Sequence, residues 1–167
     1  MPDAPLCAAL LDKIGEQIER TNHLIGLVPE GRSDWRPPRE GWTLDELIGH
    51  LLDCTSGFCA VLAAVEPQRL AHFKKLREWP ANREHSQQEA VAQLALYQDH
   101  IEEGFALLSD SDLARRVPTL FVAQGETVLT LLLGNLEHLI NHKHQLFTYL
   151  KQMGVPMATP DLYRFRS

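Results

Sequence analysis

Three histidines in this chain have the spacing of a divalent-metal site. His138 and His142 are four residues apart, which places both imidazoles on one face of a helix, about 6 Å apart along its axis. His50 lies beside Leu47 and Leu51, on the flank of a separate apolar stripe. Three neutral imidazoles hold a divalent ion and leave a position open, as in catalytic zinc sites. We therefore predict one ion bound by His50, His138 and His142.

Other ligand sets fit the spacing less well. The residue three before each of these histidines is not Glu, as a di-iron bundle would require, and the HExxH pattern is absent. Cys54 is an alternative ligand or nucleophile four residues after His50, although packing as a small residue is the simpler interpretation. His144 lies two residues after His142 and is predicted to face solvent. The other histidines are predicted to lie on the surface with no partner at ligand spacing: His23, His72, His85 and His100.

The last apolar stripe of the sequence turns polar in its middle. Asn135, His138 and His142 fall on successive turns between apolar residues, which predicts polar groups facing the interior that need partners. Asn135 is a candidate for orienting a substrate or water, and the alternative is an amide satisfied by backbone. Ligand histidines usually give their second ring nitrogen to an acceptor. The carboxylates near in sequence are Glu46, Asp53 and Glu137.

Four amphipathic segments supply the helices that must position these residues. They cover residues 4–27, 43–65, 86–108 and 126–153. Thr43 with Glu46 and Ser86 with Glu89 form capping-box patterns, and Gly154 follows the last segment. The pattern predicts an all-α four-helix bundle, formed as a single domain over residues 1–167.

The connecting segments have compositions of their own. Residues 28–42 are rich in Pro, Gly and Trp and predict an ordered loop, and residues 68–78 form a short amphipathic piece. Residues 117–123 are the one short strand candidate. Trp35, Trp42, Phe73 and Trp79 give these connections more aromatic surface than they need, which predicts a homodimer interface or a pocket rim.

Composition excludes several classes of partner. The 167 residues include 16 Lys plus Arg against 22 Asp plus Glu, a net charge of −6, and no basic block suits a phosphate backbone. We expect neither nucleic-acid binding nor a secretory signal, and no uncharged apolar run reaches the length of a membrane span. Three cysteines cannot all pair within the chain, so free thiols in a reducing cytoplasm are expected.

Two segments make the chain similar to a known family. GWTLDELIGHLLD at residues 41–53 and EHLINHKHQLFTYLKQMGVPMATPDLY at residues 137–163 resemble the DinB/YfiT-like superfamily. The family's three histidines and the glutamine, Tyr-Leu-Lys run and glycine after them fall on His50, His138, His142, Gln145, Tyr149, Leu150, Lys151 and Gly154. The chain departs from many relatives at Asn141 and His144, which are not ligand positions.

The resemblance implies a four-helix bundle with a three-histidine metal site, and several chemistries. Relatives include metal-dependent thiol transferases, thiol-dependent isomerases and proposed hydrolases, so a small-molecule substrate and a thiol cosubstrate are expectations. In these reactions a metal-bound water or thiol would be the attacking group. Nickel and zinc are the favoured ions, and iron and manganese also suit three nitrogens. The alternative is a non-enzymatic, metal-stabilised bundle that binds a ligand or partner.

Overall fold

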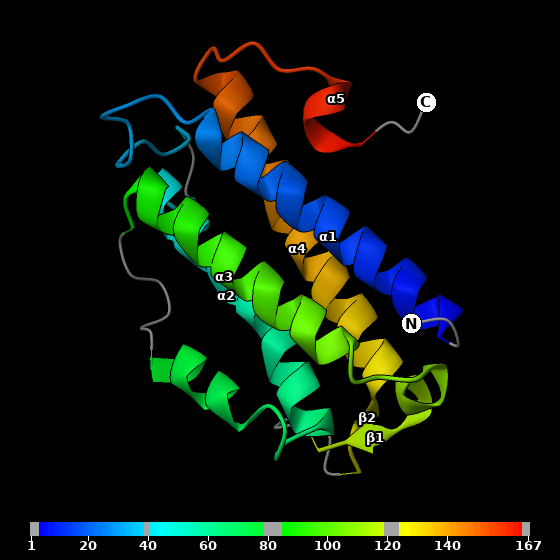
Figure 1. Ribbon diagram of the computed structural model, residues 1–167. Helices are drawn as coiled ribbons and strands as arrows, with labels where there is room; N and C mark the ends of the chain where they lie inside the picture. The colour runs from blue at the N-terminus through cyan, green and yellow to red at the C-terminus, as the bar shows by residue number, and fades with distance from the viewer. Residues whose placement is uncertain (1–3, 39–40, 79–84, 119–123, 165–167) are drawn as a thin grey trace.

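Four long helices form the body of the protein, and Figure 1 shows them lying alongside one another. The computed structural model describes residues 4–38, 41–78, 85–118 and 124–164. The helices are α1 (Pro5–Gly26), α2 (Leu44–Val65), α3 (Gln87–Phe105) and α4 (Val128–Gln152). The predicted all-α four-helix bundle is therefore confirmed.

The helices pack in a ring that differs from their order along the chain. α2 packs against α3 and α4, and α1 packs against the same two helices. α1 and α2 therefore lie diagonally across the bundle, and buried apolar side chains from all four helices form one core. Because α2 and α4 are direct neighbours, residues far apart in sequence can meet along the seam between them.

The predicted capping boxes fix the starts of two helices. The Thr43 side chain accepts a hydrogen bond from the Glu46 backbone, and the Glu46 carboxylate accepts one from the Thr43 backbone. Ser86 and Glu89 make the same reciprocal pair before α3. These bonds satisfy backbone donors that have no partner inside the first helical turn.

The connections contain several short elements. They are the 3-10 helices η1 (Ala71–Glu78) and η2 (Asp110–Ala114), the helix α5 (Thr159–Leu162) and the strands β1 (Arg116–Val117) and β2 (Glu126–Thr127). The strands pair antiparallel, with Arg116 opposite Thr127. Of the strand candidate at 117–123, only its first residue lies in a strand, and residues 119–123 lie outside the described residues.

The last long helix starts two residues later than predicted. The sequence pattern places its start at Glu126, but Glu126 and Thr127 are taken into the strand pair, and the Thr127 hydroxyl accepts a hydrogen bond from the Thr130 backbone. Periodicity alone cannot show this, because a residue that caps a helix also fits the pattern of its first turn. At the other end, Gly154 has a φ of 86°, as predicted for a glycine that terminates a helix.

The buried stripe of α4 differs from the predicted one in its middle. It passes through Leu136, Leu139 and Lys143 where Asn135, His138 and His142 were expected, and it continues at both ends through apolar residues that include Leu132, Leu146 and Leu150. The prediction that Asn135, His138 and His142 face the interior is therefore wrong. His138 is exposed and the other two are half-buried, so this second stripe lies at the seam with α2. A period of 3.6 residues allows both stripes side by side on one helix.

A buried lysine occupies the position that the predicted stripe left out. Lys143 is only 2% exposed, and its Nζ donates hydrogen bonds to Gln17 Oε1 at 2.6 Å and to the Leu162 carbonyl at 2.8 Å. Burial lowers the pKa of Lys143 to about 8. These contacts join α4 to α1 and hold the C-terminal segment against the bundle.

The helix α2 has a strongly apolar composition. Within the described part of the chain, α2 alone is long and apolar enough to cross a membrane by length and composition. In the bundle, 56% of its most apolar window is buried. The apolar side chains of α2 thus pack largely inside the bundle.

Candidate metal centre

The three predicted ligands meet at the seam between α2 and α4. His50 Nε2 lies 3.0 Å from His138 Nε2. The His142 ring centroid lies 4.4 Å from that of His50 and 4.8 Å from that of His138. One ligand atom from each histidine lies within 4.8 Å of the others, so the structure brings together the residues that the sequence singled out.

The arrangement suits a metal ion. Tetrahedral coordination at about 2.05 Å per Zn–N bond separates two ligand nitrogens by about 3.3 Å. The 3.0 Å separation of the Nε2 atoms of His50 and His138 is close to that distance, so a small outward movement of two side chains would admit an ion. An open set of three nitrogen ligands is the chemistry of zinc, nickel or iron rather than of calcium or magnesium, which prefer oxygen.

The surroundings of His50 and His138 lower the pKa values of both imidazoles. Burial, followed by the neighbouring His142 and His138, lowers the pKa of His50. Burial and His142 lower the pKa of His138 in the same direction. Both shifts favour the neutral imidazole, the form that has a lone pair available for a metal.

A hydrogen-bond chain along α4 orients the third ligand. His142 Nδ1 lies 2.9 Å from Gln145 Oε1, and Gln145 Nε2 donates to the Tyr149 hydroxyl at 3.1 Å. An amide oxygen at this position requires Nδ1 to carry the proton, which leaves Nε2 of His142 free for a metal. A carboxylate was expected to accept the second ring nitrogen of each ligand. For His142 this expectation is wrong, because the acceptor is the Gln145 amide, and Glu46 instead caps α2. Gln145 could have been found from the sequence, because it follows His142 by three residues, and residues three apart on a helix share a face.

Replacing Gln145 with leucine is expected to weaken metal binding about ten- to a hundredfold, the usual effect of losing such a partner. Leucine keeps the volume but cannot accept the Nδ1 proton, so the His142 ring loses its fixed tautomer and orientation. The measurement is competition with a chromophoric chelator at pH 7. Thr148→Leu on the same helix is the control, because its hydroxyl only donates to the His144 carbonyl. Equal affinities for wild type and Gln145→Leu would contradict this role.

The loop before α2 forms one wall of the site. The Trp42 ring lies 4.6 Å from the His50 ring and stacks on the His142 ring at 5.3 Å, yet Trp42 is 39% exposed. Trp35 packs edge-on against Tyr149 at 5.2 Å. Trp42 thus covers one side of the His50 and His142 rings, while Trp35 packs on the tyrosine at the end of the Gln145 hydrogen-bond chain.

The Asn135 amide is satisfied by a backbone group, which was the alternative to a role in orienting substrate or water. Its Nδ2 donates to the Cys54 carbonyl of α2 at 2.7 Å. A Cβ added at Gly57 would lie 2.5 Å from Asn135 Oδ1, so the glycine makes room for this amide. Asn135 therefore ties α4 to α2 a turn away from the metal ligands.

Cys54 does not join the three histidines. It is buried, and burial raises the pKa of its thiol to about 12, so it stays protonated at neutral pH. A protonated, enclosed thiol is neither a good ligand nor a nucleophile. Among the described residues, His, Cys, Asp and Glu supply no fourth ligand to the group, which leaves coordination positions open.

The remaining histidines lie apart from this centre. His144 is exposed and stacks on Phe147 at 6.0 Å, as its predicted outward direction requires. Three others have hydrogen-bond partners that spacing did not reveal: His23 with Asp161, His72 with Glu103 and His100 with the Leu96 carbonyl. None of them belongs to the metal-ligand group within the described chain.

Comparison with known proteins agrees with this structure. A DinB-like protein from Bacillus subtilis, solved by crystallography, matches it with a TM-score of 0.66 at 19% sequence identity, over 89% of this chain and 94% of that one. At this identity the match shows a shared fold. No curated protein matches the sequence. The sequence profile of the DinB superfamily matches residues 14–146. This match covers most of the chain, so the protein belongs to the DinB superfamily.

Proposed function

We propose that this protein is a metal-dependent enzyme that acts on a small molecule through His50, His138 and His142. The observation that supports this most is the convergence of three imidazoles at a partly exposed seam. A purely structural metal site is normally closed by four protein ligands. Here the described residues supply three, and His138 is exposed, so a small molecule has access from solvent.

The residues around the site define what the protein contributes to such a reaction. A divalent ion held there would act as a Lewis acid that lowers the pKa of a water or thiol. Gln145 holds the proton on His142 Nδ1, and Trp42 shields one side of the rings from water. We favour nickel or zinc as the ion, and iron or manganese would suit the same nitrogens.

The reaction class that we favour is transfer of a thiol to an electrophilic carbon. Membership of the DinB superfamily supports this class, as does the neutral ligand set, which leaves the ion its full positive charge for an incoming anion. In an addition to an activated alkene, the S–C bond forms as the π bond of the alkene breaks, and the thiol proton ends on the neighbouring carbon. Hydrolysis, with water as the nucleophile, is the second outcome that the same site would allow.

The experiment uses protein purified without a histidine tag. Metal content is measured first, and the protein is then assayed with glutathione, cysteine or cysteamine and an electrophilic chromogen, and separately with a nitrophenyl ester. We expect metal-dependent thiol transfer that His138→Ala abolishes and His144→Ala preserves. Metal that raises the melting temperature without turnover in either assay would instead support the alternative, a metal-stabilised binding module.

Two further properties belong to the proposal. The three cysteines are all free and buried, which suits a reducing cytoplasm. The homodimer stays a prediction. Trp35 and Phe73, two of the aromatics that suggested it, pack within the chain, and Trp79 lies outside the described residues. Light scattering giving a mass near the 18.9 kDa of one chain would contradict a dimer.

A further inference from the structure

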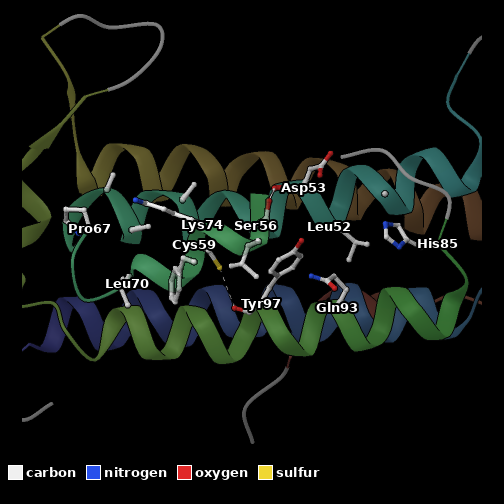
Figure 2. A pocket seen from close by; sticks show the side chains of 16 residues that line it. Leu52, Asp53, Ser56, Cys59, Pro67, Leu70, Lys74, His85, Gln93 and Tyr97 are labelled. Carbon is white, nitrogen blue, oxygen red and sulfur yellow. Dashed lines mark hydrogen bonds between the residues drawn. The ribbon is translucent and has the colours of Figure 1, made fainter. Parts of the chain in front are cut away.

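A cavity lies between α2, α3 and η1, away from the seam that holds the histidines. Figure 2 shows the side chains that line it. Its volume is about 320 Å³, at the lower end of the range for small-molecule sites. The metal centre uses α2 and α4, so the two sites share α2 but draw their other walls from different elements.

Most of the wall is apolar. Leu52 and Ala63 of α2 face Leu70, Phe73 and Leu76 from the segment that leads into and forms η1. Leu52, Leu70 and Phe73 are each no more than 3% exposed, so they are held in the core rather than free to fill the space. An apolar cavity of this size favours a ligand with an apolar body over a cluster of waters.

One wall residue carries a polar group with no partner. Gln93 of α3 is 4% exposed, and its Nε2 is buried and donates no hydrogen bond to the described residues. The Gln93 amide N–H lies near the Tyr97 hydroxyl and opposes part of the rise that burial causes in the tyrosine pKa, but Nε2 is not within hydrogen-bond geometry of that oxygen. A buried amide donor without an acceptor is unfavourable, so an acceptor from a ligand would be favourable here.

The charge near this donor selects among acceptors. Asp53, Lys74 and His85 also line the cavity, and in Figure 2 Asp53 lies on the side of Gln93 and Tyr97, whereas Lys74 lies toward Pro67. The charge of Asp53 helps to raise the pKa of Tyr97. An anionic ligand would meet the same negative field at this end of the cavity. A neutral carbonyl oxygen can accept from Gln93 without that repulsion.

We propose that this cavity binds an uncharged small molecule with an apolar body the size of one ring and a carbonyl oxygen that accepts a hydrogen bond from Gln93. The apolar body lies against Leu70 and Phe73, and the carbonyl points to α3. This site does not rest on the proposed metal-dependent activity, because it uses none of the three histidines.

The test compares two ligands of nearly the same shape, acetophenone and ethylbenzene, of which only the first has a carbonyl. Binding to the full-length chain is measured by ligand titration followed by NMR. We expect acetophenone to bind the wild type more tightly and to move the Gln93 side-chain amide signals. Gln93→Leu should weaken acetophenone about five- to tenfold, the effect of one hydrogen bond, and leave ethylbenzene unchanged. Ala63→Leu, which fills the cavity, should weaken both ligands.

Two controls separate binding in this cavity from binding at the metal centre and from a general preference for polar ligands. His138→Ala should leave both affinities unchanged, since the metal centre is not involved. Benzoate, the anionic analogue, should bind more weakly than acetophenone. The proposal is overturned if neither ligand binds the wild type, if the two bind equally, or if benzoate binds best. The movement of the Gln93 signals in the wild type decides the point even if a variant fails to fold.

Discussion

Replacing His142 with alanine is expected to lower metal affinity by more than about a hundredfold, beyond the cost of losing a partner outside the ligand set. The loss should be large because His50 and His138 would remain as a pair from two helices, without the ligand that Gln145 and Trp42 hold in place. The variant should stay folded, because the core is a continuous set of buried apolar side chains that does not include the triad. Isothermal titration with zinc or nickel and circular dichroism measure the two halves of this prediction.

The matched control is His144→Ala. His144 is on the same helix, two residues away, but it is exposed and contacts Phe147 rather than the other histidines. Its removal should change metal affinity little. If His144→Ala lost the metal and His142→Ala retained it, the assignment of ligands would be wrong. Unfolding of His142→Ala without metal would point instead to a structural role for the ion.

The elements of the fold were predictable where a local signal fixed them. The capping boxes at Thr43 and Ser86 and the glycine at position 154 mark helix ends through backbone bonds that involve only nearby residues. The start of α4 was missed because Thr127 caps a helix while also pairing with a strand. That pairing depends on a partner segment that no local pattern specifies.

The ligand set was predictable although its burial was not. Spacing four apart fixes that His138 and His142 share a face whichever way the helix is turned. The rotation of α4 depends on which of its two stripes is buried. The stripe that contains Leu132, Leu139 and Leu146 is the more apolar, and it lies in the core. Lys143 falls on that buried stripe, and its cost is offset by acceptors from Gln17 and the Leu162 carbonyl, which the sequence could not place nearby.

The cavity beside Gln93 had no signal in the sequence at all. Its walls come from α2, α3 and η1, and their spacing depends on how the helices pack. In the sequence, Gln93 has the pattern of an ordinary polar position of an amphipathic helix. Only its burial with an unpartnered amide nitrogen separates it from a solvated glutamine. Sequence patterns do not predict such a cavity, because empty space is a property of packing rather than of any residue type.

Lowering the pH from 7 to 5 is expected to release the metal, with a steep dependence. Each imidazole must be neutral to bind the ion. Below the pKa of a ligand, its protonation lowers metal affinity about tenfold per pH unit, so for three ligands the loss approaches about a thousandfold per pH unit. Burial and neighbouring histidines lower the pKa values of His50 and His138 from the usual 6.5, so protons bind these two ligands only weakly at neutral pH. Affinity should therefore hold at pH 7 and fall only below about 6.5.

Acid is also expected to destabilise the metal-free protein. The direction of this effect follows from the number of protons bound in the folded and unfolded states. A histidine with a lowered pKa in the folded protein binds fewer protons than in the unfolded chain, so acid favours unfolding as well as metal release, and both effects vanish above the unfolded pKa. Competition with a chromophoric chelator between pH 5 and 8 measures the first effect, and urea unfolding of metal-free protein measures the second. His144→Ala should follow the wild-type curve, because its ring is exposed and outside the ligand group. An affinity that stays constant down to pH 5 would mean that imidazole nitrogens do not hold the ion.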